Sequence, residues 1–312
     1  MSIKYALYSI SYLGIWYKGR AYTWKEVIDK AKDFGYDGVE FDAKRPHANP
    51  MDWDENTRKA VVDYAGNIGV TLPAVSANND FSSPIAEHRE ANLLMVKEQL
   101  KLCRDIGAPL LRVFAAWPGV TMHNGIASYD MARRNWYEYF ADVPKIERWN
   151  YVKECLIECC KYAEEFGVKL ALQNHAPIIN TWLDMDNMIR EVDSPWLKGC
   201  FDLDPLADNM TDIKAGWARM GADKSIHNHF NGEFRRIPDG SIEPVEDVYF
   251  GERHFNMKLY KEFYQEMKKT GYAGYIAYEF CHIPLINSVP QGVEMVDEQC
   301  KLALEYVKNA LA

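Results

Sequence analysis

Four clusters of polar side chains lie near the ends of predicted strands in the second half of the chain. The clusters are Gln173, Asn174 and His175; Asp202 and Asp204; His227, Asn228 and His229; and Glu279. The carboxylates interrupt apolar runs such as KGCFDLD and GYIAYEF, where an ionised group is costly to bury unless it is paired or bound to a cation. A set that mixes oxygen and nitrogen donors suits Mn²⁺, Mg²⁺, Co²⁺ or Zn²⁺. The clusters therefore predict a site for one divalent metal ion.

The spacing within these clusters places particular side chains on the same face of a strand. Side chains alternate along a strand, so Gln173 shares a face with His175, and His227 shares a face with His229. Any one of these residues could be a hydrogen-bonded polar group of the core. Clusters on successive strand ends are better explained by a shared site, because the ends of parallel strands converge in a barrel.

The elements that would position these clusters repeat along the chain. An amphipathic helix ends at a glycine, and a short apolar strand follows, in FGYDGVEFD, IGVTLPAVS, IGAPLLRVF, FGVKLALQN and TGYAGYIAYEF. Glycine suits the left-handed position after a helix, and such a strand suits a parallel sheet that is buried on both faces. The repeat predicts α/β architecture.

Strand-like runs occur at eight places. They span residues 5–11, 39–41, 72–76, 110–114, 170–174, 197–202, 225–230 and 275–280. Eight strands with intervening helices and no evident linker predict one closed (β/α)8 TIM barrel over residues 1–312, rather than two doubly wound domains. The GxGxxG phosphate loop that follows the first strand of a Rossmann domain is absent, which disfavours that fold.

Two connections, residues 115–145 and 231–256, are longer than an ordinary loop between a strand and a helix. Both follow predicted strands and so belong to the face where barrel enzymes carry their active sites. The first is rich in aromatic residues, namely Trp117, Tyr129, Trp136, Tyr137, Tyr139 and Phe140. We expect either a lid whose rings stack on a sugar or an aromatic ring, or a small local core that holds the loop together.

Composition restricts the class of protein. The 312 residues carry a formal net charge of -9, and binding to phosphate backbones requires clustered Lys and Arg, so we expect no nucleic-acid partner. The seven cysteines are odd in number and form no CxxC pair, which is typical of buried thiols in a reducing compartment. No run approaches the roughly 18 apolar residues of a membrane span. We expect a cytoplasmic protein without a membrane partner.

The segments VKLALQNH, LKGCFDLD, SIHNHF and GYIAYEF resemble the strand ends of the sugar phosphate isomerase/epimerase family, which has a xylose isomerase-like TIM barrel. The similarity covers nearly the whole chain. It implies one divalent metal ion, with Mn²⁺ expected first, held by Gln173, Asp202, His227 and Glu279. Gln173 departs from the family pattern, in which glutamate is commoner. Its amide oxygen can still bind a metal ion, but glutamine has no charge and cannot act as a base.

The same resemblance implies a reaction that begins with proton removal beside a sugar carbonyl. Ketose epimerases of this kind use two metal-binding glutamates, and here only Glu279 remains as a catalytic carboxylate. His175 is the natural replacement base, because imidazole titrates near neutral pH. The candidate substrate-binding residues are Glu40, Trp117 and His229. Glu40 could instead cap a helix or pair with the lid, and His229 could instead orient an aspartate ligand.

A narrower resemblance is to the larger, metal-binding subunit of bacterial C-glycoside deglycosidases. It implies a carbon–carbon lyase that cleaves the C-glycosidic bond of 3-oxo C-glycosides, in which a proton leaves sugar C2 and the aromatic aglycone is eliminated from C1. It also implies a small β-rich second subunit and a hetero-oligomer. The alternative is a sugar isomerase or epimerase, such as a ketose 3-epimerase or an inosose dehydratase-like enzyme, that acts by a metal-stabilised enediolate.

Two further interpretations fit less of the sequence. An endonuclease IV-like DNA repair enzyme would need a histidine three residues after the aspartate of the sixth strand, where this chain has Pro205. A non-catalytic sugar-binding subunit would explain Gln173 as a decayed ligand. The polar clusters that remain on the other strands argue against that interpretation.

Overall fold

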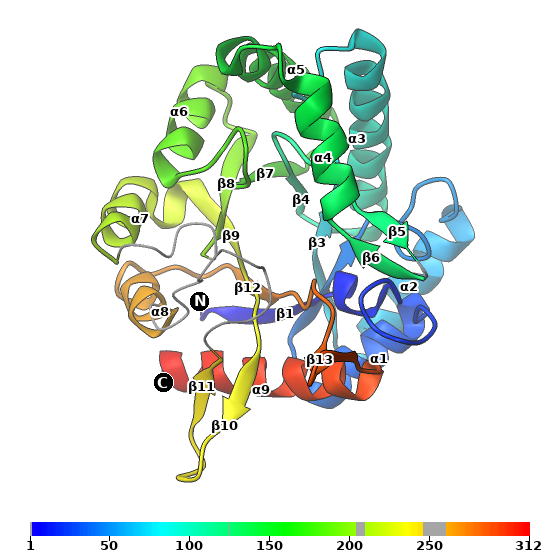
Figure 1. Cartoon of the computed structure of the whole chain (residues 1–312), viewed down its shortest axis with the longest axis vertical. Helices are drawn as coiled ribbons and strands as arrows, with labels where there is room; N and C mark the ends of the chain where they lie inside the picture. The colour runs from blue at the N-terminus through cyan, green and yellow to red at the C-terminus, as the bar shows by residue number, and fades with distance from the viewer. Residues whose placement is uncertain (1, 124, 204–209, 246–259) are drawn as a thin grey trace.

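Eight parallel strands form a closed barrel in the computed structural model of the protein, which describes residues 2–123, 125–203, 210–245 and 260–312. Around the barrel the strands follow one another in the order β1, β12, β9, β8, β7, β4, β3 and β2. Helices surround the strands on the outside (Figure 1). This is the (β/α)8 TIM barrel that the sequence predicts, so the fold class is confirmed.

The barrel strands coincide closely with the predicted ones. They are β1 (Lys4–Tyr8), β2 (Gly38–Asp42), β3 (Thr71–Ser76), β4 (Leu110–Val113), β7 (Lys169–Gln173), β8 (Leu197–Asp202), β9 (Ser225–Phe230) and β12 (Tyr275–Tyr278). The last strand ends before the predicted residue 280, so Glu279 lies one residue beyond β12.

The first strand is shorter than predicted, because a 3-10 helix, η1 (Ser9–Tyr12), follows β1. The serines of this segment explain the early end. The backbone N–H of Asp42 donates to Ser9 Oγ at 2.8 Å, and that of Phe280 donates to Ser11 Oγ at 2.9 Å. Side-chain hydroxyls therefore take the place of the backbone carbonyls that a continued strand would offer.

The helices end where the sequence places its glycines. The described helices are α1 (Trp24–Phe34), α2 (Glu55–Ile68), α3 (Ala86–Ile106), α4 (Asp130–Phe140), α5 (Lys145–Phe166), α6 (Trp182–Val192), α7 (Met210–Lys224), α8 (Tyr260–Lys269) and α9 (Val293–Leu311). Glycine caps α1, α2, α3 and α5 in the left-handed region, with φ between 69° and 87°. Other residues are strained at this φ, which is why glycine marks the helix ends.

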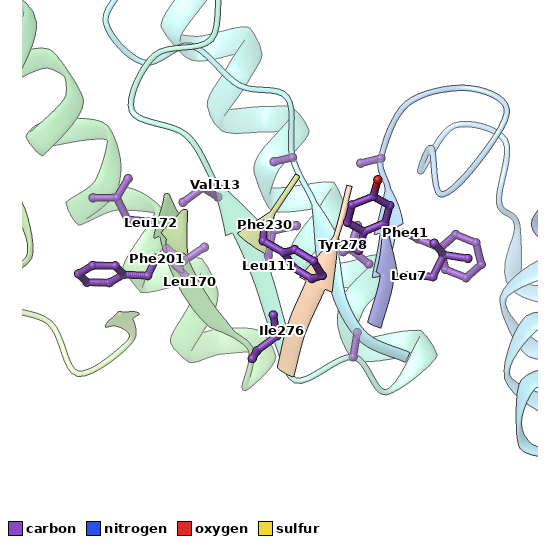
Figure 2. Close-up of a cluster of buried hydrophobic side chains, with 14 of the residues drawn as sticks. Leu7, Phe41, Leu111, Val113, Leu170, Leu172, Phe201, Phe230, Ile276 and Tyr278 are labelled. Carbon is purple, nitrogen blue, oxygen red and sulfur yellow. The ribbon is translucent and has the colours of Figure 1, made fainter. Parts of the chain in front are cut away.

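The hydrophobic core lies between the strands and the surrounding helices. Figure 2 shows side chains of this layer, which include Leu7, Phe41, Leu111, Val113, Leu170, Leu172, Phe201, Phe230, Ile276 and Tyr278. Burying a side chain of this size contributes roughly 1.5–3 kcal/mol. The alternate side chains point into the barrel, where Ala74, Leu110, Ala171 and Cys200 form a separate small cluster. Each lies two residues before a polar residue of the mouth on its strand, so this cluster closes the interior beneath the polar site.

The long connection after β4 carries secondary structure of its own. It contains the hairpin of β5 (Thr121–His123) and β6 (Ile126–Ser128), followed by α4. The backbone N–H of Ala127 donates to the carbonyl of Ile15 at 2.7 Å, and the Tyr129 hydroxyl donates to the carbonyl of Cys281 at 3.1 Å. These bonds tie the connection to the loops that follow β1 and β12, so it reaches across part of the barrel mouth.

The second long connection follows β9 and begins with the hairpin of β10 (Phe234–Arg236) and β11 (Ile242–Pro244). In Figure 1 this yellow hairpin extends away from the barrel. The rest of the predicted connection, residues 246–256, lies outside the described residues. A shorter hairpin of β13 (Leu285–Ile286) and β14 (Val289–Pro290) follows β12.

The cysteines and the helices agree with the sequence-based expectations. All seven cysteines lie in the described residues and none forms a disulfide, and all but Cys281 are buried. Burial raises the pKa of the Cys159 thiol well above its usual value, which keeps it protonated and unreactive. Among the described helices, none has the length and apolar character needed to cross a membrane.

His47, in the loop after β2, is held as a buried neutral imidazole. Its Nε2–H donates to the carbonyl of Tyr22, and its Nδ1 accepts from the hydroxyl of Ser9, both at 3.0 Å. Burial lowers the pKa of His47 from 6.5 to about 4. Between these two values the unfolded chain binds a proton that the folded chain does not, so stability falls as the pH falls through this window.

We expect His47 alone to reduce the free energy of unfolding by roughly 3 kcal/mol between neutral pH and pH about 4, because one pKa unit corresponds to about 1.4 kcal/mol. His47→Gln does not titrate and should remove that part of the pH dependence. Urea unfolding over this pH range measures it, with the exposed His88→Gln as control. Identical pH profiles for the wild type and His47→Gln would contradict the prediction.

Candidate active site

The C-terminal ends of the strands gather the predicted site residues at the mouth of the barrel. The residues are Glu40 of β2, Gln173 of β7, Asp202 of β8, His227 and His229 of β9, and Glu279 just after β12. All six side chains are buried. Side chains that are far apart in sequence therefore meet in one polar layer.

Glu40 lies between the two histidines of β9. Its Oε2 is 2.6 Å from Nε2 of His227, its two oxygens are 3.0 and 2.9 Å from Nε2 of His229, and the Ser76 hydroxyl also donates to it. Donor atoms of these three residues lie within 4.8 Å of one another, which is close enough to hold a metal ion. Each Nε2 must carry a proton to donate to the carboxylate, so this face of both imidazoles is already occupied.

The two histidines of this cluster differ in their protonation state. Burial alone would raise the pKa of Glu40, but His229 and His227 lower it well below its usual value. Burial lowers the pKa of His227, which outweighs the opposing effect of Glu40. Burial also acts to lower the pKa of His229, but Glu40 and Glu279 together raise it to about 10. Glu40 therefore pairs with an imidazolium at His229 and with a neutral imidazole at His227.

His229 lies nearer to the other carboxylates than His227 does. In the barrel ladder His229 is in register with Asp202, whereas His227 is in register with Cys200, one inward-facing position deeper. Nδ1 of His229 is 3.5 Å from Oε2 of Glu279. The other nitrogen of His229 is already hydrogen-bonded, so Nδ1 is the atom that faces the remaining acidic residues.

Gln173 and Asp202 are joined by a direct hydrogen bond, in which Nε2 of Gln173 donates to Oδ2 of Asp202 at 2.6 Å. Only the NH₂ group of an amide can donate, so Oε1 of Gln173 remains as an acceptor. This buried atom has no hydrogen-bond partner among residues 2–123, 125–203, 210–245 and 260–312. Asn174 accepts from the backbone N–H of Asp202 at 2.9 Å and donates to its carbonyl at 2.8 Å. The sequence marks Asn174 as polar but does not reveal this positioning role. Asp204 lies outside the described residues.

His175 follows β7 as a half-buried residue between aromatic rings. Its Nδ1 is 2.7 Å from the carbonyl oxygen of Ala176, which can only accept, so Nδ1 carries the proton and Nε2 carries the lone pair. The ring centroid lies 5.0 Å from those of both Phe114 and Trp117, with edge-to-face geometry. Burial lowers the pKa of His175 to about 4, so its imidazole is neutral at pH 7.

The aromatic residues of the 115–145 connection divide into two groups. Trp117 contacts Tyr129 edge-to-face, with a centroid separation of 5.7 Å, on the side near the barrel mouth. Trp136 and Phe140 contact each other at 5.1 Å and lie against the guanidinium of Arg148. The expected local core is therefore present at Trp136 and Phe140. A stacking role for Trp117 in a lid stays a prediction.

Arg112 of β4 is a buried cation at the mouth that the sequence analysis does not single out. Only 1% of it is exposed, and it donates to the Tyr8 hydroxyl at 2.6 Å and to the carbonyl of Ala77 at 3.1 Å. The Tyr8 hydroxyl in turn donates to Asp42 at 2.6 Å. A signal for this residue exists, because LLRVF places one charge within an apolar strand, as the acidic clusters do.

Comparisons with known proteins agree with this architecture. The profile of the family described as xylose isomerase-like TIM barrel matches residues 28–299. L-ribulose-5-phosphate 3-epimerase UlaE of Escherichia coli is 21% identical over 262 residues, which cover 80% of each chain. D-psicose 3-epimerase from Clostridium cellulolyticum H10 has a TM-score of 0.71 at 17% identity and covers 99% of both chains. For 3-keto-D-glucoside 4-epimerase YcjR from E. coli the TM-score is 0.68 at 15% identity, over 99% of this chain and 100% of that one.

Glu40→Gln should destabilise the protein strongly, because it removes the counter-charge of the buried His229 imidazolium. Removing one partner of a buried ion pair typically costs about 3–5 kcal/mol. Guanidinium chloride unfolding of the metal-free protein measures the change. The control is Glu243→Gln, which breaks an exposed pair with Arg235 that is worth about 0–1 kcal/mol. Equal losses in the two variants would contradict the charge assignment.

Proposed function

This chain belongs to the xylose isomerase-like TIM barrel family, and from that premise we propose that it is a sugar isomerase or epimerase that moves a proton at the carbon beside a sugar carbonyl. The observation that carries the proposal is the neutral His175 at the mouth, whose ring is fixed so that Nε2 keeps its lone pair. Two similar proteins are named for 3-epimerisation, one of a ketose phosphate and one of a free ketose.

The donor atoms at the mouth fit a divalent metal ion. Oε1 of Gln173 is buried and has no hydrogen-bond partner among the described residues. The carboxylate of Asp202 adjoins Gln173, and that of Glu279 lies 3.5 Å from Nδ1 of His229. An orphaned buried group such as Oε1 costs roughly 1–3 kcal/mol unless something satisfies it. We therefore assign the ion to these four residues, with Mn²⁺ as the first candidate and Mg²⁺, Co²⁺ or Zn²⁺ as alternatives.

This ligand set replaces His227, which the family resemblance implied, with His229. Nδ1 of His227 also lacks a hydrogen-bond partner within the described part of the chain, but His227 lies deeper than His229, in register with Cys200. His229 also donates to Glu40, and its Nδ1 faces Glu279. A bound ion would take the place of the proton that Nδ1 carries in the metal-free protein. A carboxylate that holds the far nitrogen of an imidazole is a common support for a metal-binding histidine.

The chain's own residues supply the proton transfer in this proposal. When bound, a divalent ion polarises the sugar carbonyl as a Lewis acid. Nε2 of His175 takes the proton from the neighbouring carbon, and the ring becomes an imidazolium. Its Nδ1–H remains bonded to the carbonyl of Ala176, so the ring keeps its orientation during the transfer. Trp117 and Phe114 flank the ring and limit the access of water to it.

Glu279 is the second proton-transferring group of the proposal. It follows β12, which β9 and β8 separate from β7 in the barrel, so Glu279 and His175 approach a substrate from different sides. Epimerisation requires a proton to return to the face opposite the one it left. Burial alone would raise the pKa of Glu279, but His229 and Arg112 lower it, so Glu279 is ionised at rest and must take up a proton from solvent before it can supply one to that face. Isomerisation requires that His175 return the proton to the adjacent carbon and that a second proton move from the neighbouring hydroxyl to the former carbonyl oxygen.

A second candidate function is the C-glycoside lyase. Gln173 favours it, because an elimination needs one base and not two matched carboxylates, and Trp117 beside His175 offers an aromatic aglycone a stacking surface. His175 would take the C2 proton of a 3-oxo C-glycoside. The bond from C1 to the aglycone breaks, its electron pair and a proton go to the aglycone carbon, and an unsaturated keto sugar remains. The resemblance to C-glycoside deglycosidases also implies a small β-rich second subunit for this function.

Metal content distinguishes the two histidines of β9. We expect about one equivalent of manganese per chain after incubation with Mn²⁺ and desalting. His229→Ala and Asp202→Asn should lose it, whereas His227→Ala should retain it. Mass spectrometry measures the metal, and circular dichroism checks that each variant is folded. Loss in His227→Ala with retention in His229→Ala would restore the ligand that the family resemblance implied.

His175→Gln should lower kcat by about 10²–10⁴-fold, the usual contribution of a positioned general base, and leave the metal content unchanged. Proton NMR in D₂O measures deuterium uptake and product formation, with D-psicose, L-ribulose 5-phosphate and a 3-oxo C-glycoside as substrates. His88→Gln, an exposed histidine, is the matched control.

The product separates the candidate functions. Deuterium beside the carbonyl of an isomer or epimer supports the isomerase or epimerase, and release of a free aglycone supports the lyase. Full turnover by His175→Gln would exclude His175 as the base in both reactions.

A further inference from the structure

We propose that a corner of the mouth beside His175 binds an anionic oxygen group of the substrate, and this inference rests on the proposed function. The corner consists of Trp16, Trp117, Tyr129 and Arg133, and is called the donor corner below. Trp16 comes from the loop after β1, and the other three come from the connection after β4. The inference adds a substrate feature, a negatively charged oxygen substituent, that the proton-transfer chemistry does not require.

The donor corner contains two buried indole N–H groups. Nε1 of Trp16 and Nε1 of Trp117 are both buried, and neither has a hydrogen-bond partner in the part of the chain that the structure describes. Only 3% of Trp16 is exposed. Indole N–H can only donate, and buried donors are almost always paired in folded proteins. Two such donors that adjoin the same residue are placed to bind an acceptor group of a ligand.

Arg133 adds a positive charge to these donors. Its guanidinium lies over the ring of Tyr129, 5.0 Å from the centroid. Within the described part of the chain it makes no side-chain hydrogen bond and no ion pair, whereas Arg235 and Arg236 each contact a glutamate. A half-buried arginine without a carboxylate partner is typical of a site that receives its anion from a ligand.

The ring of Tyr129 brings the three donors together. Its centroid is 5.0 Å from that of Trp16 and 5.7 Å from that of Trp117, and the guanidinium of Arg133 covers the same ring. Trp117 also contacts His175 at 5.0 Å. A ligand group held by the donor corner therefore lies beside the proposed base and not on a remote surface.

The chemistry of the corner selects an anion over a sugar hydroxyl. A hydroxyl needs an acceptor for its own proton as well as donors for its lone pairs, and the polar atoms that Trp16, Trp117 and Arg133 present are donors only. A phosphate ester or an ionised phenol presents only acceptors and carries the charge that matches a guanidinium. The sugar phosphate and the phenolic aglycone are thus two sources of the same anionic oxygen chemistry.

The test measures binding of two probes, inorganic phosphate and 4-nitrophenolate, to the Mn²⁺-loaded protein by isothermal titration calorimetry. Arg133→Met should weaken binding of the preferred probe by about 10-fold or more, the usual loss for a charge-assisted hydrogen bond. Arg133→Lys should recover part of that loss. Trp16→Phe, which keeps a ring and removes the N–H, should weaken binding by several-fold. The matched control is Arg134→Met, an exposed arginine next to it in α4, which should leave binding unchanged.

The two probes distinguish the source of the anion. An Arg133-dependent affinity for phosphate assigns a phosphorylated sugar, and one for 4-nitrophenolate assigns an aglycone with an ionised phenol. Equal affinities in Arg133→Met and Arg134→Met, or binding of neither probe by the folded wild type, would overturn the proposal. These binding measurements require no turnover, so they test the donor corner independently of the base. The anion-binding proposal can be wrong while His175 is the base, and His175 can be wrongly assigned while the donor corner binds its anion.

Discussion

The buried carboxylate of Glu40 is the interaction on which the mouth of the barrel depends. It comes from β2 but binds two histidines of β9, a strand from which β1 and β12 separate it. Such a charge is stable at this depth because His229 is protonated beside it. The same hydrogen bonds fix the orientation of each ring, so Nδ1 of His229 is directed at Glu279. One ionised side chain thereby sets the orientation of the polar layer above it.

Most of the barrel could be predicted from the sequence because the signals are local. A glycine after each of several helices and the apolar run that follows it require no knowledge of distant contacts. The end of the first strand is different, because Ser9 and Ser11 accept from the backbone of Asp42 and Phe280, which are 33 and 269 residues away in the chain. A boundary that depends on distant partners leaves no pattern in the residues around it.

The candidate site could be predicted as a group of residues but not in its internal arrangement. Alternation places His227 and His229 on the same face, and only the register with Asp202 shows which of them lies nearer the opening. The partner of the Gln173 amide is likewise a contact between neighbouring strands and not a pattern within one. The criterion that identifies the acidic residues also applies to Arg112, since this residue too interrupts an apolar strand. Its partners, in contrast, come from the ends of β1 and β3.

The apolar residues that fill the barrel interior determine how molecules reach the site. Four side chains that are at most 7% exposed lie below the polar layer, namely Ala74, Leu110, Ala171 and Cys200. They block the passage of a molecule along the barrel axis. The connection after β4 covers part of the remaining opening. A product and the next substrate must therefore use the same passage in turn. The product has to leave before the next substrate can bind. Slow product release would therefore limit kcat even when the chemical step is fast.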